Sequence, residues 1–164
     1  MEIELKEAAR PEDLMAFVEA ILSGEPNLNA NLANIAALLY QYLPRINWVG
    51  FYLLEQSSGD WVLGPFAGKP ACTRIAKGHG VVGRALQEGR IIVVDDVTTF
   101  EGHITCDVDS RSEIVVPIRV GDLVVAGLDV DSPNPSRFCS EDIPLLRWVS
   151  DRLGNSWLNS RWYA

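Results

Sequence analysis

Three cysteines are the side chains of this sequence best suited to act as nucleophiles, and their surroundings differ. Cys106 lies in the polar segment GHITCD, where a thiol is more available as a thiolate than in an apolar run. Cys72 lies in a second polar segment, KPACTRI, whereas Cys139 has no apparent chemical company and is given no role. A cysteine can equally be a small buried apolar residue, so the chemistry of Cys106 has to be argued from its neighbours.

Acidic side chains follow Cys106 in an informative pattern. Glu113 comes seven residues later, at the entry to a predicted strand. Asp129 and Asp131 are two residues apart near the end of the apolar run LVVAGLDVDS, so they face the same side of a strand. They could form a solvated strand end. If they instead converge on a small pocket, at least one pKa rises and a proton stays available at neutral pH.

Together these groups suit one redox step. A thiolate that attacks a sulfoxide sulfur needs a neighbouring acid for the oxygen, and the reaction leaves a sulfenic acid that a second thiol converts to a disulfide. Cys72 can supply that thiol if its Cα comes within roughly 4.4–6.8 Å of the Cα of Cys106. Trp48 and Tyr52, on one face of a predicted strand, could hold a methylthio group or be ordinary core aromatics.

The spacing of apolar residues predicts the elements that must position these groups. Leu28, Leu32 and Ile35 recur at helical spacing, whereas residues 45–54 are apolar or aromatic on both alternating phases, as in a strand covered on both faces. The predicted elements are two helices within about 11–43, strands at 45–54 and 61–66, a short helix at 81–89, strands at 91–97, 114–120 and 123–132, and a final helix over about 140–160.

This order of elements predicts an α+β class. Hairpins joined directly favour an antiparallel sheet, and the N- and C-terminal helices can cover one of its faces. The polar loops around Cys72 and Cys106 then cover a ligand pocket on the other face. We expect one domain over residues 1–164, with the sheet and the site loops at about 45–133.

Composition narrows the possible partners. The chain has 14 basic and 22 acidic side chains and a net charge of -8, which disfavours binding to nucleic acid or to an anionic membrane. It shows no signal peptide and no apolar run of about 18 residues, so we expect a cytoplasmic protein. His79 and His103 have no metal-ligand spacing with the cysteines, which argues against zinc.

Six segments resemble the signature blocks of the free methionine-(R)-sulfoxide reductase family and occur in that family's order. The resemblance implies a GAF fold, no metal or organic cofactor, a cytoplasmic homodimer, free methionine-(R)-sulfoxide as substrate and recycling by thioredoxin as the external dithiol. The segments are INWVGFYLL (46–54), LGPFAGKPACTRI (63–75), GHGVVG (78–83), FEGHITCD (100–107), SEIVVPI (112–118) and LDVDSP (128–133).

The resemblance also assigns the two thiols. Cys106 matches the attacking cysteine of the family and Cys72 matches a resolving cysteine. Many members carry a further cysteine ten residues after the position of Cys72, where this sequence has Val82. The protein must therefore resolve its sulfenic acid with Cys72 or accept an external thiol directly at Cys106.

The remaining matches concern the pocket. Glu113, Asp129 and Asp131 match carboxylates that contact the sulfoxide and the amino group, and Trp48 and Tyr52 match aromatic residues around the methyl group. We assign Glu113 and Asp131 to catalysis, and Asp129 and the two aromatics to substrate binding. The alternative is a GAF module that senses a small ligand without catalysis, which would leave Cys106 and the acids unexplained.

Overall fold

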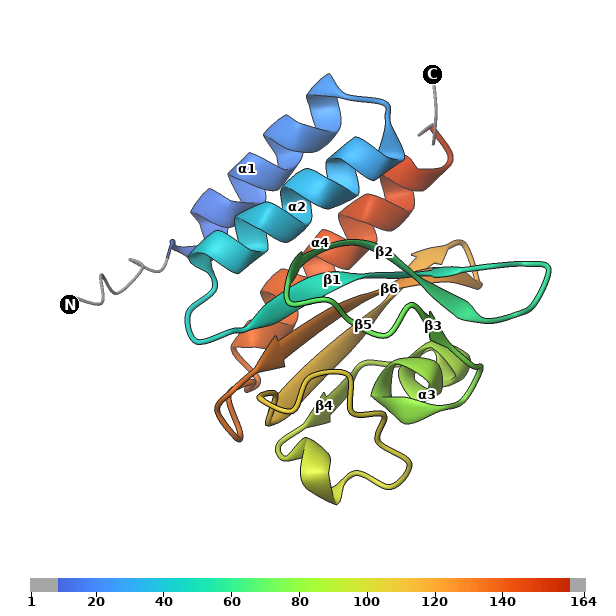
Figure 1. Ribbon diagram of the computed structural model, residues 1–164. Coiled ribbons are helices and arrows are strands. Elements are labelled where there is room, and N and C mark those ends of the chain that lie inside the picture. The colour runs from blue at the N-terminus through green and yellow to red at the C-terminus, as the bar shows by residue number, and fades with distance from the viewer. Residues whose placement is uncertain (1–8, 160–164) are drawn as a thin grey trace.

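Six strands form a single antiparallel sheet with the order β3-β2-β1-β6-β5-β4 (Figure 1). The computed structural model describes residues 9–159. Two hairpins, β1–β2 and β5–β6, supply most of the sheet, and β1 pairs with β6 to join them. The strands are β1 (Trp48–Leu54), β2 (Trp61–Gly68), β3 (Arg74–Ile75), β4 (Ile92–Val94), β5 (Ser112–Val120) and β6 (Leu123–Ser132).

Helices cover both faces of this sheet unequally. Three long helices pack together on one face, and the short α3 lies with the long loops on the other (Figure 1). Local sequence fixes the starts of two of them, since α1 begins at a proline and the side chain of Asn27 accepts a hydrogen bond from the backbone N–H of Ala30 in α2. The helices are α1 (Pro11–Gly24), α2 (Leu28–Tyr42), α3 (Gly80–Glu88) and α4 (Asp142–Trp157), with a short 3-10 turn at Val97–Thr99.

Alternation along the strands separates two apolar cores. On β1, Val49 and Phe51 point into the core beneath α1, α2 and α4, while Trp48 and Tyr52 point to the opposite face. All four side chains are almost fully buried, and burying each of the larger ones contributes roughly 2 kcal/mol. The strand is therefore apolar on both phases because both of its faces are covered.

The second core depends on a close approach of α3 to the sheet. A Cβ atom at Gly127 of β6 would lie 2.6 Å from Cδ2 of Leu86, so a larger residue there would force the Leu86 side chain to move. Gly89 then ends α3 in the left-handed conformation, with φ 63°. This contact packs the last turn of α3 closely against β6.

The α+β class, the antiparallel sheet and the placement of the terminal helices on one face are confirmed. The predicted strand at 91–97 was too long, because Asp96 accepts hydrogen bonds from the backbone and hydroxyl of Thr98 and turns the chain into a 3-10 turn. The two-residue strand β3 was missed. The final helix ends at Trp157. Its predicted end near residue 160 lies outside the described residues, and so do residues 1–8 and 161–164. The single domain over residues 1–164 stays a prediction.

None of the helices within residues 9–159 has the length and the apolar character that crossing a membrane requires.

Candidate active site

A bulge in the β5–β6 hairpin brings two acids opposite each other. The pairing register shifts between Ile118 and Arg119, where β6 carries one extra residue. Beyond this point Glu113 lies opposite Asp131, and facing residues of antiparallel strands share one side of the sheet. Without the bulge, the register that begins at the β5–β6 turn would pair Glu113 with Val130, whose side chain belongs to the core under the long helices.

Asp129 completes a group that we call the acid trio: Glu113, Asp129 and Asp131. One carboxylate oxygen from each residue lies within 4.8 Å of the other two. Glu113 and Asp129 are 6% and 5% exposed, so water screens them little. Two full charges at this separation repel by about 3 kcal/mol at an effective dielectric of about 20, so the trio cannot hold three charges cheaply.

The electrostatics of the trio follow from that crowding. Burial raises the pKa of all three carboxyls well above the usual range. The charge of Asp131 adds to this effect on the pKa of Glu113, and the charge of Glu113 adds to it on that of Asp129. A hydrogen bond between the side chains of Asp129 and Glu113 raises the pKa of Asp129 and lowers that of Glu113. The trio can therefore retain a proton at neutral pH and still attract a cation.

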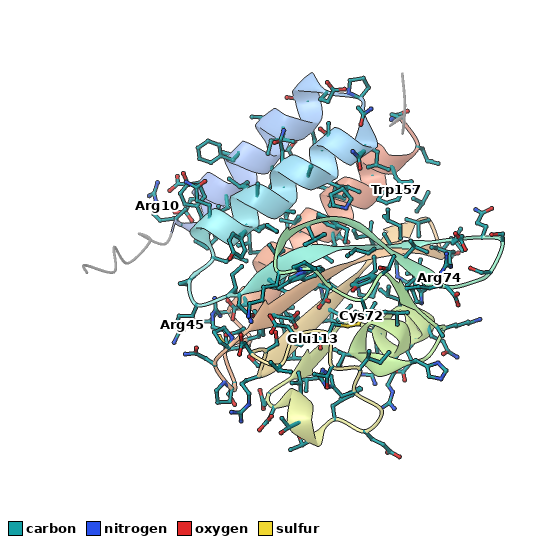
Figure 2. The ribbon with its side chains drawn as sticks, in the orientation of Figure 1. Arg10, Arg45, Cys72, Arg74, Glu113 and Trp157 are labelled. Carbon is teal, nitrogen blue, oxygen red and sulfur yellow. A yellow bond between two sulfur atoms is a disulfide. The ribbon has the colours of Figure 1, made fainter. Side chains whose placement is uncertain are left out.

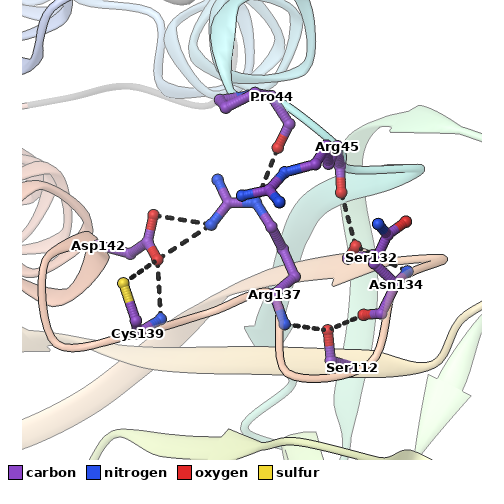
Figure 3. Close-up of polar contacts among 8 residues, drawn as sticks. All are labelled: Pro44, Arg45, Ser112, Ser132, Asn134, Arg137, Cys139 and Asp142. Carbon is purple, nitrogen blue, oxygen red and sulfur yellow. Dashed lines mark hydrogen bonds and ion pairs between the residues drawn. The ribbon is translucent and has the colours of Figure 1, made fainter.

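A polar network braces the strand ends that carry these acids (Figure 3). The hydroxyl of Ser112 donates to the carbonyl oxygen of Asn134 at 2.6 Å, and the hydroxyl of Ser132 donates to that of Arg45 at 2.6 Å. The backbone N–H of Arg137 donates to Ser112 in turn. Each serine immediately adjoins an acid of the hairpin, so the network fixes the backbone at the trio.

A disulfide joins the two cysteine loops above the trio. Cys72 and Cys106 are bonded, with their Cα atoms 5.4 Å apart, and both residues are partly exposed. Figure 2 shows Cys72 and Glu113 on the same side of the sheet, away from the long helices. The condition set for Cys72 as the second thiol is met, and the structure is that of the oxidised form.

The aromatic residues Trp48 and Tyr52 of β1 line the site and also form hydrogen bonds to the Cys72 loop. The indole Nε1 of Trp48 donates to the carbonyl oxygen of Lys69 at 3.1 Å, and the hydroxyl of Tyr52 donates to that of Cys72 at 2.9 Å. Burial, and then the charge of Asp129, raise the pKa of Tyr52, so its hydroxyl stays a donor. Sequence reasoning identified the rings but not these contacts, which fasten the Cys72 loop to the sheet.

A pocket of about 540 Å³, including its open mouth, lies between the sheet, α3 and the two loops. Among the described residues that line it, none is lysine or arginine. The first turn of α3 reaches it, and the backbone N–H groups of such a turn attract anions. The structure brings all seven predicted site residues together here: Trp48, Tyr52, Cys106, Glu113, Asp129 and Asp131 line the pocket, and Cys72 is bonded to Cys106.

The acid trio has the oxygen atoms to bind either a protonated amine, by accepting its hydrogen bonds, or a divalent cation. Its oxygens are close enough to share one ion, and Oδ1 of Asp129 is buried without a hydrogen-bond partner. The sequence predicts no metal, and that stays a prediction. His103 lines the same pocket, and burial lowers its pKa, so it is neutral at physiological pH.

Comparison with known proteins places the chain in a family. A model of the GAF domain matches residues 27–157. The free methionine-R-sulfoxide reductase of Escherichia coli is 47% identical over 141 residues, covering 86% of this chain and 84% of the relative. The chain belongs to the free methionine-R-sulfoxide reductase family. The resemblance recognised in the sequence is thereby confirmed.

Solved structures of this reductase family have the same fold. The free methionine-R-sulfoxide reductase of Neisseria meningitidis, in complex with its substrate, superimposes with a TM-score of 0.90 at 37% identity, covering 94% of this chain and 95% of the other. The reduced form from Staphylococcus aureus gives 0.85 at 43% identity, covering 90% and 94%. The yeast reductase from Saccharomyces cerevisiae is 39% identical over 151 residues, covering 88% and 84%.

Val82 stands where the sequence resemblance implies a further cysteine in many members of the family. It is buried in the first turn of α3 and lines the pocket, so an apolar group occupies the position of the additional thiol. Cys139 does not line this pocket, and its backbone N–H and thiol both contact Asp142. Among the described residues, Cys72 is the thiol in reach of Cys106.

Proposed function

We propose that this protein reduces free methionine-R-sulfoxide to methionine by thiol chemistry at Cys106. One observation carries the proposal: the Cys72–Cys106 disulfide closes a pocket whose floor is the buried acid trio. A redox-active pair alone would suit many reactions. The acid trio adds a proton donor for the sulfoxide oxygen and a negative charge that binds an ammonium group. A free amino acid sulfoxide has such an ammonium group, whereas a peptide-bound one does not.

The pocket suggests an orientation for that substrate. The ammonium group lies at the acid trio, where the unpartnered Oδ1 of Asp129 accepts from it. The methylthio end lies against the stacked rings of Trp48 and Tyr52, whose centroids are 6.1 Å apart. The carboxylate lies at the first turn of α3, because no basic side chain lines the pocket among the described residues.

The reaction follows from this placement. The thiolate of Cys106 attacks the sulfoxide sulfur while Glu113 or Asp131, kept protonated by burial, donates a proton to the oxygen. Oxygen passes from substrate sulfur to Cys106, which gives methionine and a sulfenic acid. The thiol of Cys72 then displaces that oxygen as water and forms the disulfide. An external dithiol reduces the disulfide and closes the cycle.

Further parts of the proposal concern the setting of the enzyme. Thioredoxin is the external dithiol, and the partial exposure of both disulfide residues supports direct exchange with it. The protein works in the cytoplasm as a homodimer, without a resident metal or organic cofactor. Gel filtration with light scattering and a metal analysis of the purified protein test the last two points.

A coupled assay tests the proposal as a whole. With thioredoxin, its reductase and NADPH, we expect NADPH consumption with the R epimer of free methionine sulfoxide and none with the S epimer. Cys106→Ser should abolish it, while Cys139→Ser, which removes an exposed thiol outside the pocket, should leave it unchanged. Turnover by Cys106→Ser would overturn the mechanism. Tight binding of a small ligand with no turnover would favour a ligand-sensing module instead.

A further inference from the structure

An ion cluster joins the two cysteine loops in parallel with the disulfide. Lys69 precedes Cys72 by three residues, and its Nζ lies 3.8 Å from Oδ1 of Asp107, the residue after Cys106. The same ammonium group forms an ion pair with Asp109. This cross-link is independent of the sulfur atoms, so it can persist when the disulfide opens.

Hydrogen bonds that involve main-chain atoms fix both loops at this ion cluster. The carbonyl of Lys69 accepts from Trp48, which fixes the start of the Cys72 loop on β1. On the other loop, the backbone N–H of Asp109 donates to Oδ1 of Asp107 at 2.9 Å, in a turn that directs both acids toward Lys69. Asp107 is only 11% exposed, so its charge is more weakly screened than that of an ordinary surface acid.

We propose that Lys69 is a positioning residue for the resolving step: its ion pairs with Asp107 and Asp109 hold the Cys72 loop against the Cys106 loop while the disulfide is open. This inference rests on the proposed function. After oxygen transfer, the sulfenic acid on Cys106 must meet the Cys72 thiol, because Cys139, the other cysteine among the described residues, does not line the pocket. The rate of that meeting is set by the effective concentration of Cys72, which a tether between the loops raises.

The exposure of the Lys69 and Asp109 side chains limits how much their ion pair can accelerate disulfide formation. The side chains of Lys69 and Asp109 are 62% and 59% exposed, and exposed ion pairs stabilise an arrangement only modestly. Removing the lysine charge should therefore slow disulfide formation by about two- to fivefold. Salt at about 1 M, where the screening length is about 3 Å, should slow the wild type to nearly the same rate.

The experiment separates oxygen transfer from resolution. Fully reduced protein is mixed with one equivalent of free methionine-R-sulfoxide and quenched over time. Methionine reports the first step, and the Cys72–Cys106 peptide reports the second. A sulfenic acid trap, dimedone, measures the intermediate between them. In Lys69→Met we expect methionine to form at the wild-type rate, the disulfide to form more slowly and the dimedone adduct to increase.

Matched variants control for charge and for structure. The exchange of charges in Lys69→Asp with Asp109→Lys should restore the rate of disulfide formation. Arg90→Met removes the same charge from an exposed pair with Glu88 outside the pocket and should change neither step. Equal disulfide rates in Lys69→Met and wild type would overturn the proposal, as would a parallel slowing of both steps or a failure of the exchanged pair to rescue.

A second oxidant keeps the test independent of the proposed substrate. Hydrogen peroxide converts the Cys106 thiol to a sulfenic acid and releases water, after which Cys72 resolves it as before. If no variant forms methionine from the sulfoxide but Lys69→Met still resolves peroxide-generated sulfenic acid slowly, the proposed function fails and the role of Lys69 stands. Wild-type resolution by Lys69→Met with peroxide removes that role.

Discussion

Replacing Glu113 by glutamine removes one titratable carboxyl from the acid trio while keeping the shape of the side chain. The trio confines three carboxyls within 4.8 Å in a buried pocket, and each ionised pair costs about 3 kcal/mol at an effective dielectric of about 20. The folded protein avoids this repulsion by keeping Glu113 protonated above its ordinary pKa, and Glu113→Gln removes the free-energy cost of doing so. We expect the substrate-free, oxidised protein to become more stable at pH 7 by about 1–3 kcal/mol, even though its activity falls strongly.

The pH dependence gives this prediction its sign. Burial raises the pKa of Glu113 in the folded state, so the folded protein binds its proton more tightly than the unfolded chain does. That contribution to stability is fully present below the unfolded pKa, about 4.3, and is lost as pH rises through the folded pKa. The advantage of Glu113→Gln should therefore vanish near pH 4 and grow toward pH 8.

Denaturant unfolding of both proteins from pH 4 to pH 8, with the disulfide intact, measures the difference directly. Asp122→Asn removes one negative charge from the exposed β5–β6 turn and controls for net charge. A Glu113→Gln protein that is less stable than wild type at pH 7, or a stability difference that does not vary with pH, would show that the folded protein does not hold Glu113 at a raised pKa.

Three further predictions follow from other contacts. Cys72→Ser should release one methionine per chain in a burst and then turn over at least about tenfold more slowly with thioredoxin, since Val82 leaves no second thiol; undiminished steady-state NADPH consumption would contradict this. Gly50→Ala should cost about 1–3 kcal/mol in denaturant unfolding and raise KM, because its Cβ would lie 2.5 Å from Cβ of Phe66 and 2.5 Å from the indole of Trp48; an unchanged KM would count against Trp48 as part of the site. Arg137→Met should cost about 3 kcal/mol by leaving Asp142 without its two hydrogen bonds from the guanidinium, and unchanged stability would show that the brace is dispensable.

Much of the site could be predicted because its residues occupy informative positions. Acids at the end of an apolar strand are costly unless they are paired or used, and their two-residue spacing put Asp129 and Asp131 on one face. The acidic residues that follow Cys106 distinguished it from Cys139, which has no apparent chemical company. The ordered sequence blocks then supplied the substrate class, which no single residue could.

The rest depended on geometry that sequence pattern does not encode. Whether Glu113 faces Asp131 is decided by a one-residue bulge between Ile118 and Arg119, and the alternation of either strand is the same with or without it. The hydrogen bond from Tyr52 to the Cys72 loop joins residues far apart in sequence through a side-chain tip. Periodicity reports which face a ring occupies, but not what its polar end contacts.

The most direct measurement of the central claim is a single turnover without any external reductant. Fully reduced protein receives one equivalent of free methionine-R-sulfoxide under anaerobic conditions, and both products are counted by mass spectrometry. We expect one methionine and one Cys72–Cys106 disulfide per chain, and neither product from Cys106→Ser. Absence of methionine from the wild type, or an equal yield from Cys106→Ser, would contradict it.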